Sequence, residues 1–249
     1  MKLFDCDTAY GRGALALPRE IETAPDLIAE LDHSGIGEAL VWHRDAWERD
    51  FALGNQRLAE LDAFPRLHPA MTFVPACNAE MPSAEGFLDA MRRTGARVIR
   101  AFPAHHCFCL DATSCGDLLE LFIAHSVPVF VPLPEIPSGW DGVYRLLRDL
   151  PKLTLVLTET GCWGQDRYFI PLMKKYPHFA ITTNRLETAG QLKSIVNSVG
   201  FGHVLFGSGL PRNYPGCYAL SLARADISDE ARDAIAHGNI ERILEEVSV

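Results

Sequence analysis

Residues 153–159 read LTLVLTE, six residues without a charge that end at a carboxylate. A run that is apolar throughout is typical of a parallel strand covered on both faces. Further short apolar and β-branched runs recur along the chain, and their first residues lie 25 to 36 positions apart. They occupy residues 2–7, 38–43, 70–75, 97–102, 128–133, 178–183 and 203–208. Each interval leaves room for one helix between consecutive strands.

Amphipathic stretches with recognisable helix ends separate these runs. Leu27, Ile28 and Leu31 share one helical face, and Gly35 follows them as a stop signal. Ser83 precedes a helix that we expect to stop at Gly95. Near the end of the chain, Ser228 begins a helix that Gly238 ends, and a last helix over Asn239–Val247 packs beside the body.

Eight strand–helix repeats in 249 residues predict a single α/β domain over residues 1–249, folded as a (β/α)8 TIM barrel. The alternative is an open doubly wound sheet. That layout rarely needs eight evenly spaced strands, and the chain lacks the glycine-rich phosphate loop that often accompanies it.

Composition narrows the classes of partner. The formal net charge is −9 and no run of Lys or Arg interrupts it, so we expect no nucleic-acid partner. No apolar stretch approaches the ~20 residues of a membrane span, and the first residues, MKLFDCDTAYGRG, contain no apolar signal region. Seven cysteines, an odd count, indicate reduced thiols in the cytoplasm. A small-molecule ligand is the expected partner, and a homo-oligomer is possible.

In such a barrel, function lies at the carboxyl ends of the strands. We expect Asp5 and Asp7, two residues apart, to project from the same face of the first strand. Glu159 ends an apolar strand, so its carboxylate either pairs with a cation or has a raised pKa. Arg100 is the evident partner. This pair is either a structural tie between strands or part of a ligand site.

Two further strand-end residues are candidates. His43 directly follows the second strand, and an unperturbed pKa of ~6.5 suits it to acid–base work. The alternative is a polar residue that caps a helix or lines a loop. Trp42 contributes to an apolar pocket wall, or else only to packing. The segment His105–Cys109 (HHCFC) lacks the usual ligand spacing of structural zinc, so we do not read it as a metal site.

Nearly the whole chain resembles the amidohydrolase-related family of metal-dependent hydrolases, which are TIM barrels. The likeness is best in residues 176–211 (YPHFAITTNRLETAGQLKSIVNSVGFGHVLFGSGLP) and 225–244 (ADISDEARDAIAHGNIERIL). Residues 27–43 and 54–75 agree with the second and third units of the family.

The resemblance implies a metal centre, but this chain lacks its histidines. The family positions fall on Asp7, Ala9, a residue near Pro132, Glu159 and Gly209. A zinc site with three protein ligands is therefore not expected, and Asp7 and Glu159 are the only possible ligands there. These two carboxylates, with Asp5 and waters, could hold Mg²⁺, Mn²⁺ or Ca²⁺. They could instead form a metal-free acid–base pair, or be remnants in a barrel that only binds a ligand.

The sequence thus predicts a divergent amidohydrolase-like hydrolase, or a related lyase, acting on a small anionic organic substrate. The acid–base groups would be Asp7, His43 and Glu159. The substrate-binding residues would be Arg100, Asp5 and Trp42. We expect Asp7, Glu159 and Arg100 to share one polar cluster with His43 at its edge. The alternative is a non-catalytic ligand-binding or regulatory barrel.

Overall fold

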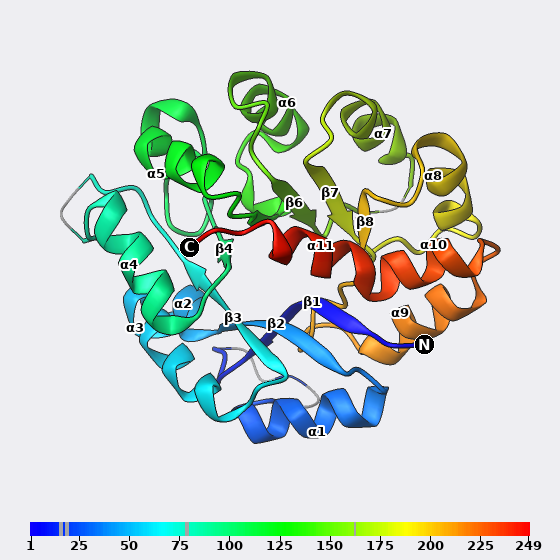
Figure 1. The fold of residues 1–249 in the computed structure, drawn as a ribbon, viewed down its shortest axis with the longest axis horizontal. Helices are drawn as coiled ribbons and strands as arrows, with labels where there is room; N and C mark the ends of the chain where they lie inside the picture. Colours follow the sequence, from blue (N-terminus) through cyan, green and yellow to red (C-terminus); the bar gives the residue numbers. More distant parts are fainter. Residues whose placement is uncertain (15–16, 18–19, 78–79, 162) are drawn as a thin grey trace.

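Eight parallel strands follow one another around a barrel in chain order (Figure 1). The computed structural model describes all residues except 15–16, 18–19, 78–79 and 162. The strands are β1 (Phe4–Tyr10), β2 (Glu38–His43), β3 (Leu67–Thr72), β4 (Val98–Arg100), β5 (Val129–Pro132), β6 (Leu155–Thr158), β7 (Phe179–Thr182) and β8 (Val204–Leu205). The predicted (β/α)8 barrel is confirmed. Of the eight strands, β3 differs most from expectation, because it begins three residues earlier than its apolar run.

Backbone hydrogen bonds between β1 and the segment after β8 close the barrel. The amide of Cys6 donates to the carbonyl of Phe206, and the amide of Ala9 donates to that of Leu210, both at 2.9 Å. In the opposite direction, the amide of Gly209 donates to the carbonyl of Asp7 at 2.9 Å. The seam therefore continues beyond the two residues of β8, to the level at which the site lies.

Helices surround the strands, with local start and stop signals at several of their ends (Figure 1). Thr23 and Asp26 form a reciprocal capping box at the start of the first helix, which ends at Gly35 with φ 70°. The α-helices are α1 (Ala24–Ser34), α2 (Asp45–Glu48), α3 (Phe51–Arg57), α4 (Ala84–Thr94), α5 (Ala112–Ala124), α6 (Gly139–Asp149), α7 (Asp166–Lys175), α8 (Gln191–Val199), α9 (Pro215–Arg224), α10 (Asp229–Asp233) and α11 (Asn239–Glu245). Shorter turns are η1 (Leu58–Ala63), η2 (Leu133–Glu135) and the π-turn η3 (Ala234–Gly238).

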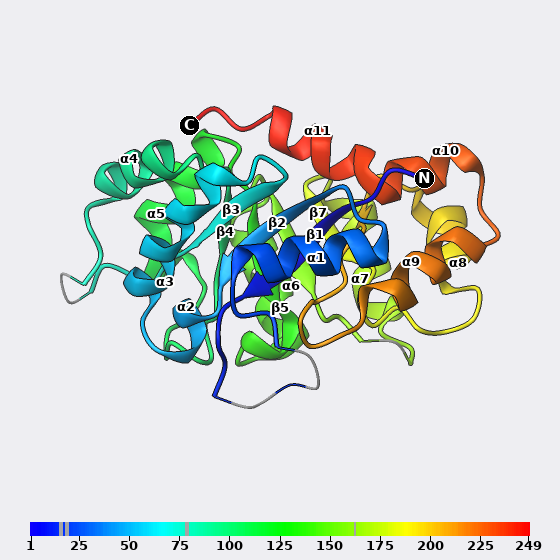
Figure 2. The ribbon, with the colours of Figure 1, turned by 90° about the horizontal axis from the view of Figure 1, so that it is seen from below.

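The last helix corrects two expectations. Gly238 has helical dihedral angles (φ −59°, ψ −38°), so the chain continues through η3 into α11 instead of stopping there. In addition, α11 lies across the amino end of the barrel and not beside its body (Figure 2). Its Ile240, Ile243 and Leu244 pack against the side chains that fill the barrel interior. The reason is hydrophobic, because the open end of that core would otherwise face water.

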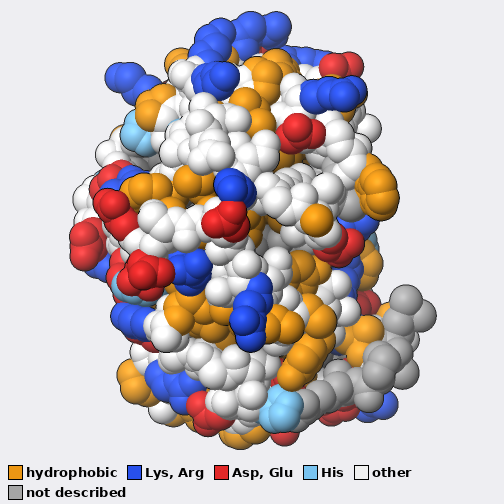
Figure 3. Space-filling view, turned by 90° about the vertical axis from the view of Figure 1, so that its right-hand side faces the viewer, with side chains coloured by type: hydrophobic (Ala, Val, Ile, Leu, Met, Phe, Trp, Pro, Cys, Tyr) orange, Lys and Arg blue, Asp and Glu red, His pale blue; other side chains and the backbone are white. Residues whose placement is uncertain are grey.

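The amino end is therefore covered by α11, and a ligand can approach the barrel at its carboxyl end. Figure 3 shows the side that carries α8, α9 and α10, where apolar and charged side chains are interspersed. Within the described parts of the chain, no helix combines the length and the apolar composition needed to cross a membrane.

Candidate functional site

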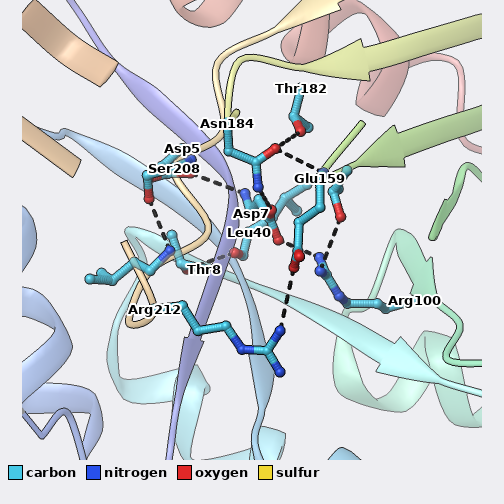
Figure 4. Close-up of polar contacts among 12 residues, drawn as sticks. Asp5, Asp7, Thr8, Leu40, Arg100, Glu159, Thr182, Asn184, Ser208 and Arg212 are labelled. Atoms are coloured by element: carbon cyan, nitrogen blue, oxygen red, sulfur yellow. Dashed lines mark hydrogen bonds and ion pairs between the residues drawn. The ribbon is translucent and has the colours of Figure 1, made fainter. Parts of the chain in front are cut away.

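A polar cluster lies at the carboxyl ends of the strands, built from residues far apart in the sequence (Figure 4). Asp7 comes from β1, Arg100 ends β4, and Glu159 directly follows β6. Asn184 follows β7, and Arg212 lies in the segment after β8. The predicted grouping of Asp7, Arg100 and Glu159 at this end is present, but Arg100 pairs with Asp7, and Glu159 pairs with Arg212 instead of the expected Arg100. Asn184 and Arg212 join the cluster from positions for which the sequence analysis predicted no role.

A bulge in β1 separates the two aspartates. Asp5 pairs with Ala39 and Thr8 with Val41, so β1 holds one residue more than β2 over this stretch. Phe4 and Cys6 pack inside the barrel, so the side chain of Asp5 between them points into the barrel wall. Asp7, in contrast, lines a cavity at the mouth of the barrel. The expectation that both carboxylates share one face is wrong, because the bulge breaks the two-residue alternation.

Asp5 stabilises the seam of the barrel and does not line the cavity. Its Oδ1 accepts hydrogen bonds from the backbone amides of Asp7, at 3.1 Å, and Ser208, at 3.0 Å. The residue is fully buried. Burial raises the pKa of its carboxyl to about 7, although hydrogen bonds from Ser208 and from the Asp7 backbone act in the opposite direction.

Arg100 and Asp7 form a buried ion pair. Arg100 Nη1 lies 2.5 Å from Asp7 Oδ1, and their side chains are 5% and 3% exposed. The guanidinium also lies over the rings of Trp42 and Phe102, with Cζ 5.2 Å and 5.5 Å from their centroids. An arginine cannot lose its proton to escape burial, so the pair neutralises both charges in place. Trp42 thus lines the cavity as predicted, and it also covers the guanidinium of Arg100.

Asn184 links Asp7 to Glu159. Its Oδ1 accepts hydrogen bonds from the backbone amide of Glu159 at 3.0 Å and from the hydroxyl of Thr182 at 2.6 Å. A backbone amide can only donate, so the orientation of the Asn184 amide is fixed. Its Nδ2 therefore donates to Asp7 Oδ2 at 2.9 Å. Asn184 was visible from the sequence as a polar residue after a strand, but nothing local indicated which groups it would join.

Glu159 adopts a backbone conformation that favours glycine. Its φ is 55°, in the left-handed region, where a side chain is strained. The carboxylate is 18% exposed, and its Oε1 lies 3.6 Å from Nη1 of Arg212 (Figure 4). Arg212 is 59% exposed and lies on a loop, so no strand-end pattern could have identified it. Strain at a carboxylate on a cavity wall is typical of a functional position.

These residues line a narrow cavity at the mouth of the barrel that opens to solvent. Its wall combines ionised side chains with an apolar part. The charged members are Asp7, Arg44, Glu48, Arg100, Glu135, Glu159 and Arg212; the apolar ones include Trp42, Trp47, Phe102, Pro132 and Leu210.

His43 is not part of this cavity lining. Its ring packs edge-on against Tyr10, with centroids 4.7 Å apart, and its Nδ1 accepts a hydrogen bond from the backbone amide of Asp45 at 3.1 Å. Burial lowers the pKa of His43, and the opposing charge of Asp45 does not offset this effect. The packing matches the alternative of a histidine beside a loop, and an acid–base role for His43 remains a prediction without structural support.

The residues at the expected metal positions do not fit a metal ion. Asp7 has one oxygen on a guanidinium and the other on an amide donor. Ala9, Pro132 and Gly209 have no ligating side chain. Within the described residues, no group of three or more His, Cys, Asp or Glu side chains is placed to hold a metal.

This arrangement predicts that the protein is indifferent to divalent cations. Treating it with a chelator and then adding Zn²⁺, Mn²⁺ or Mg²⁺ should leave the thermal midpoint unchanged, because a cation would have to displace the Arg100 guanidinium. Differential scanning calorimetry at each step measures this. A saturable rise of the midpoint with one cation would show that Asp7 is released from Arg100 to bind it.

Comparisons with known proteins agree with the fold. A family model described as amidohydrolase matches residues 17–245. An uncharacterised TIM-barrel protein from Bordetella bronchiseptica is 18% identical over 99% of both chains, with a TM-score of 0.74. The 2,6-dihydroxybenzoate decarboxylase from Rhizobium is 14% identical over 98% of both chains, with a TM-score of 0.75. The 4-oxalomesaconate hydratase from Rhodopseudomonas palustris is 13% identical over 98% of this chain and 96% of its own, with a TM-score of 0.69. A search of curated proteins found no match.

Proposed function

This chain belongs to the amidohydrolase family, and from that membership we propose that it is a hydrolase or a related lyase acting on a small organic acid. The reaction takes place in the cavity at the carboxyl end of the barrel. Glu159 is the group that takes up and releases the proton. The observation that carries this proposal is the strained backbone of Glu159, which holds an ionisable group on the cavity wall.

Glu159 suits either reaction class. In hydrolysis, its carboxylate accepts the proton of a water molecule that attacks the substrate; in a lyase step, its protonated form donates to the substrate. Arg212 Nη1 lies 3.6 Å from the carboxylate, so a positive charge faces the group that exchanges the proton. Asn184 fixes the backbone at Glu159 and so orients the carboxylate toward the cavity.

Asp7 acts in this scheme as a positioning residue. Both of its oxygens are engaged, one by Arg100 and one by Asn184, so it is not free to exchange a proton with a substrate. Asp7 keeps the Arg100 guanidinium fixed at the floor of the cavity. The names of two neighbours of the same fold, a 2,6-dihydroxybenzoate decarboxylase and a 4-oxalomesaconate hydratase, support a small organic acid as substrate.

Two variants of Glu159 test the proposal. Glu159→Gln should reduce turnover by about 10²–10⁴-fold, because it removes the proton-transfer group and keeps the shape. Glu159→Gly should lose turnover equally, yet be up to about 1 kcal/mol more stable, because glycine relieves the left-handed strain. Turnover is measured on the best substrate from a panel of small aromatic acids, lactones and esters, and stability by denaturant unfolding. A glycine variant that is both active and less stable contradicts the proposal.

The second candidate is a barrel that binds a ligand without transforming it. The full engagement of Asp7 favours this reading, because one of the two carboxylates at family metal positions is removed from chemistry. It predicts binding of small acids with no turnover anywhere in the panel, and no difference between the wild type and Glu159→Gln in that assay.

A further inference from the structure

Three guanidinium groups line the cavity within the described residues, and two of them are already engaged. Arg44 is 11% exposed and pairs with Glu48 at 3.1 Å and with Glu20 at 3.8 Å. Arg100 is 5% exposed and pairs with Asp7. Both side chains are mostly buried and already lie against a carboxylate, so an anionic ligand gains less from them than from an exposed arginine.

Arg212 differs from both. Its side chain is 59% exposed, and the ion pair that it forms with Glu159 within the described part of the chain is long at 3.6 Å. A guanidinium presents five N–H donors in a planar fork, so Nη1 can face Glu159 while another edge receives a carboxylate. Figure 4 shows Arg212 approaching Glu159 from the side opposite Asn184.

Arg212 also rests on a fixed platform. Its Cζ lies 5.5 Å from the ring centroid of Trp47. Trp47 stacks on His105, with centroids 4.1 Å apart, and its Nε1 donates to Glu135 at 3.1 Å. The other oxygen of Glu135 accepts the backbone amide of His105 at 2.9 Å. A guanidinium held on an anchored ring loses less conformational freedom when it binds a ligand.

We infer that Arg212, supported by Trp47, is the residue that binds the carboxylate group of the substrate. This inference rests on the proposed function, and it moves the anion-binding role from Arg100 to a loop residue. A carboxylate on the outer edge of Arg212 lies next to Glu159, while an aromatic or apolar body extends toward Trp42, Phe102 and Leu210. The substrate class that fits is a small acid with one carboxylate and a flat apolar body.

The cavity charges support this location. Four carboxylates, those of Asp7, Glu48, Glu135 and Glu159, oppose the three arginines, so the lining has a small net negative charge. A ligand carboxylate is repelled from most of this wall, and the mouth beside Arg212 offers unengaged donors.

Isothermal titration with benzoate, and with benzamide as its uncharged analogue, tests the inference. The wild type should bind benzoate more tightly than benzamide. Arg212→Gln should weaken benzoate binding by about ten- to a hundredfold and leave benzamide binding unchanged, because a charged hydrogen bond contributes about 1.5–3 kcal/mol. Arg212→Lys should bind with intermediate affinity, because it keeps the charge and loses the fork. The matched control is Arg185→Gln, which removes an exposed charge after β7 from a residue outside the cavity lining.

The outcomes separate this inference from the proposed function. Glu159→Gln should bind benzoate a few-fold more tightly, because it removes the like charge beside the ligand carboxylate, although it strongly reduces turnover. Equal benzoate affinity in the wild type and Arg212→Gln, or no benzoate binding by the wild type, overturns the inference while turnover by Glu159 stands. Binding that depends on Arg212 without turnover of any substrate supports the inference and rejects the hydrolase or lyase.

Discussion

Replacing Arg100 with alanine is expected to lower the free energy of unfolding by about 3–5 kcal/mol. The substitution leaves the Asp7 carboxylate at 2% exposure, with the Asn184 amide as the remaining hydrogen-bond partner of its side chain within the described residues. A buried charge without its partner is destabilising. The intact ion pair adds little net stability, because the attraction between the two charges mainly offsets the cost of removing them from water. The midpoint of denaturant unfolding, with an unchanged slope, measures the effect.

Arg212→Ala is the matched control, because Arg212 lines the same cavity but its side chain is 59% exposed. Its stability should change by no more than about 1 kcal/mol. The double variant Asp7→Ala/Arg100→Ala should be less destabilised than the sum of the two single variants, since it strands no charge. If Arg100→Ala is as stable as Arg212→Ala, the ion pair is not a structural tie and the ligand-binding interpretation of Arg100 regains its place.

Asp5→Asn is expected to flatten the dependence of stability on pH between about 4 and 7. Burial raises the pKa of Asp5 from 3.8 to about 7 in the folded protein. Over this window the folded state holds a proton that the unfolded state has released, so stability falls as the pH rises. Three pH units at about 1.36 kcal/mol each correspond to a loss of up to about 4 kcal/mol, which is complete above pH 7. An asparagine cannot ionise, and it still accepts the amides of Asp7 and Ser208.

Unfolding in denaturant at pH 5 and at pH 8 gives the two values needed for each protein. For each protein, the free energy of unfolding at pH 8 is subtracted from that at pH 5. This difference should be larger in the wild type than in Asp5→Asn. Asp89→Asn, an exposed carboxylate paired with Arg92, is the control and should behave like the wild type. An equal pH dependence in the wild type and Asp5→Asn would show that Asp5 ionises without a penalty, with water reaching its second oxygen.

The architecture followed from local features of the sequence. Uncharged runs such as residues 153–158, spaced by capped amphipathic stretches, indicate parallel strands alternating with helices, and eight of them make a barrel. Helix starts at Thr23 and Ser83 follow from hydrogen bonds that close within three residues. The end of the barrel at which the polar cluster lies follows too, because parallel strands carry their carboxyl ends to one edge.

The membership of the site was decided by contacts between distant segments. The bulge that separates Asp5 from Asp7 lies in β1, at the seam where β1 meets the segment after β8. The alternation of side chains along a regular strand does not predict such a bulge. Arg212 contacts Glu159 from a loop. Asn184 binds Asp7, which lies 177 positions earlier in the sequence, and Glu159, which lies 25 positions earlier. Such pairings depend on barrel closure and on loop paths, which long-range packing fixes. Sequence periodicity therefore determined the scaffold and the edge on which the polar cluster lies. Which carboxylate is neutralised by a buried arginine, and which faces the cavity beside an exposed one, was decided by the tertiary structure.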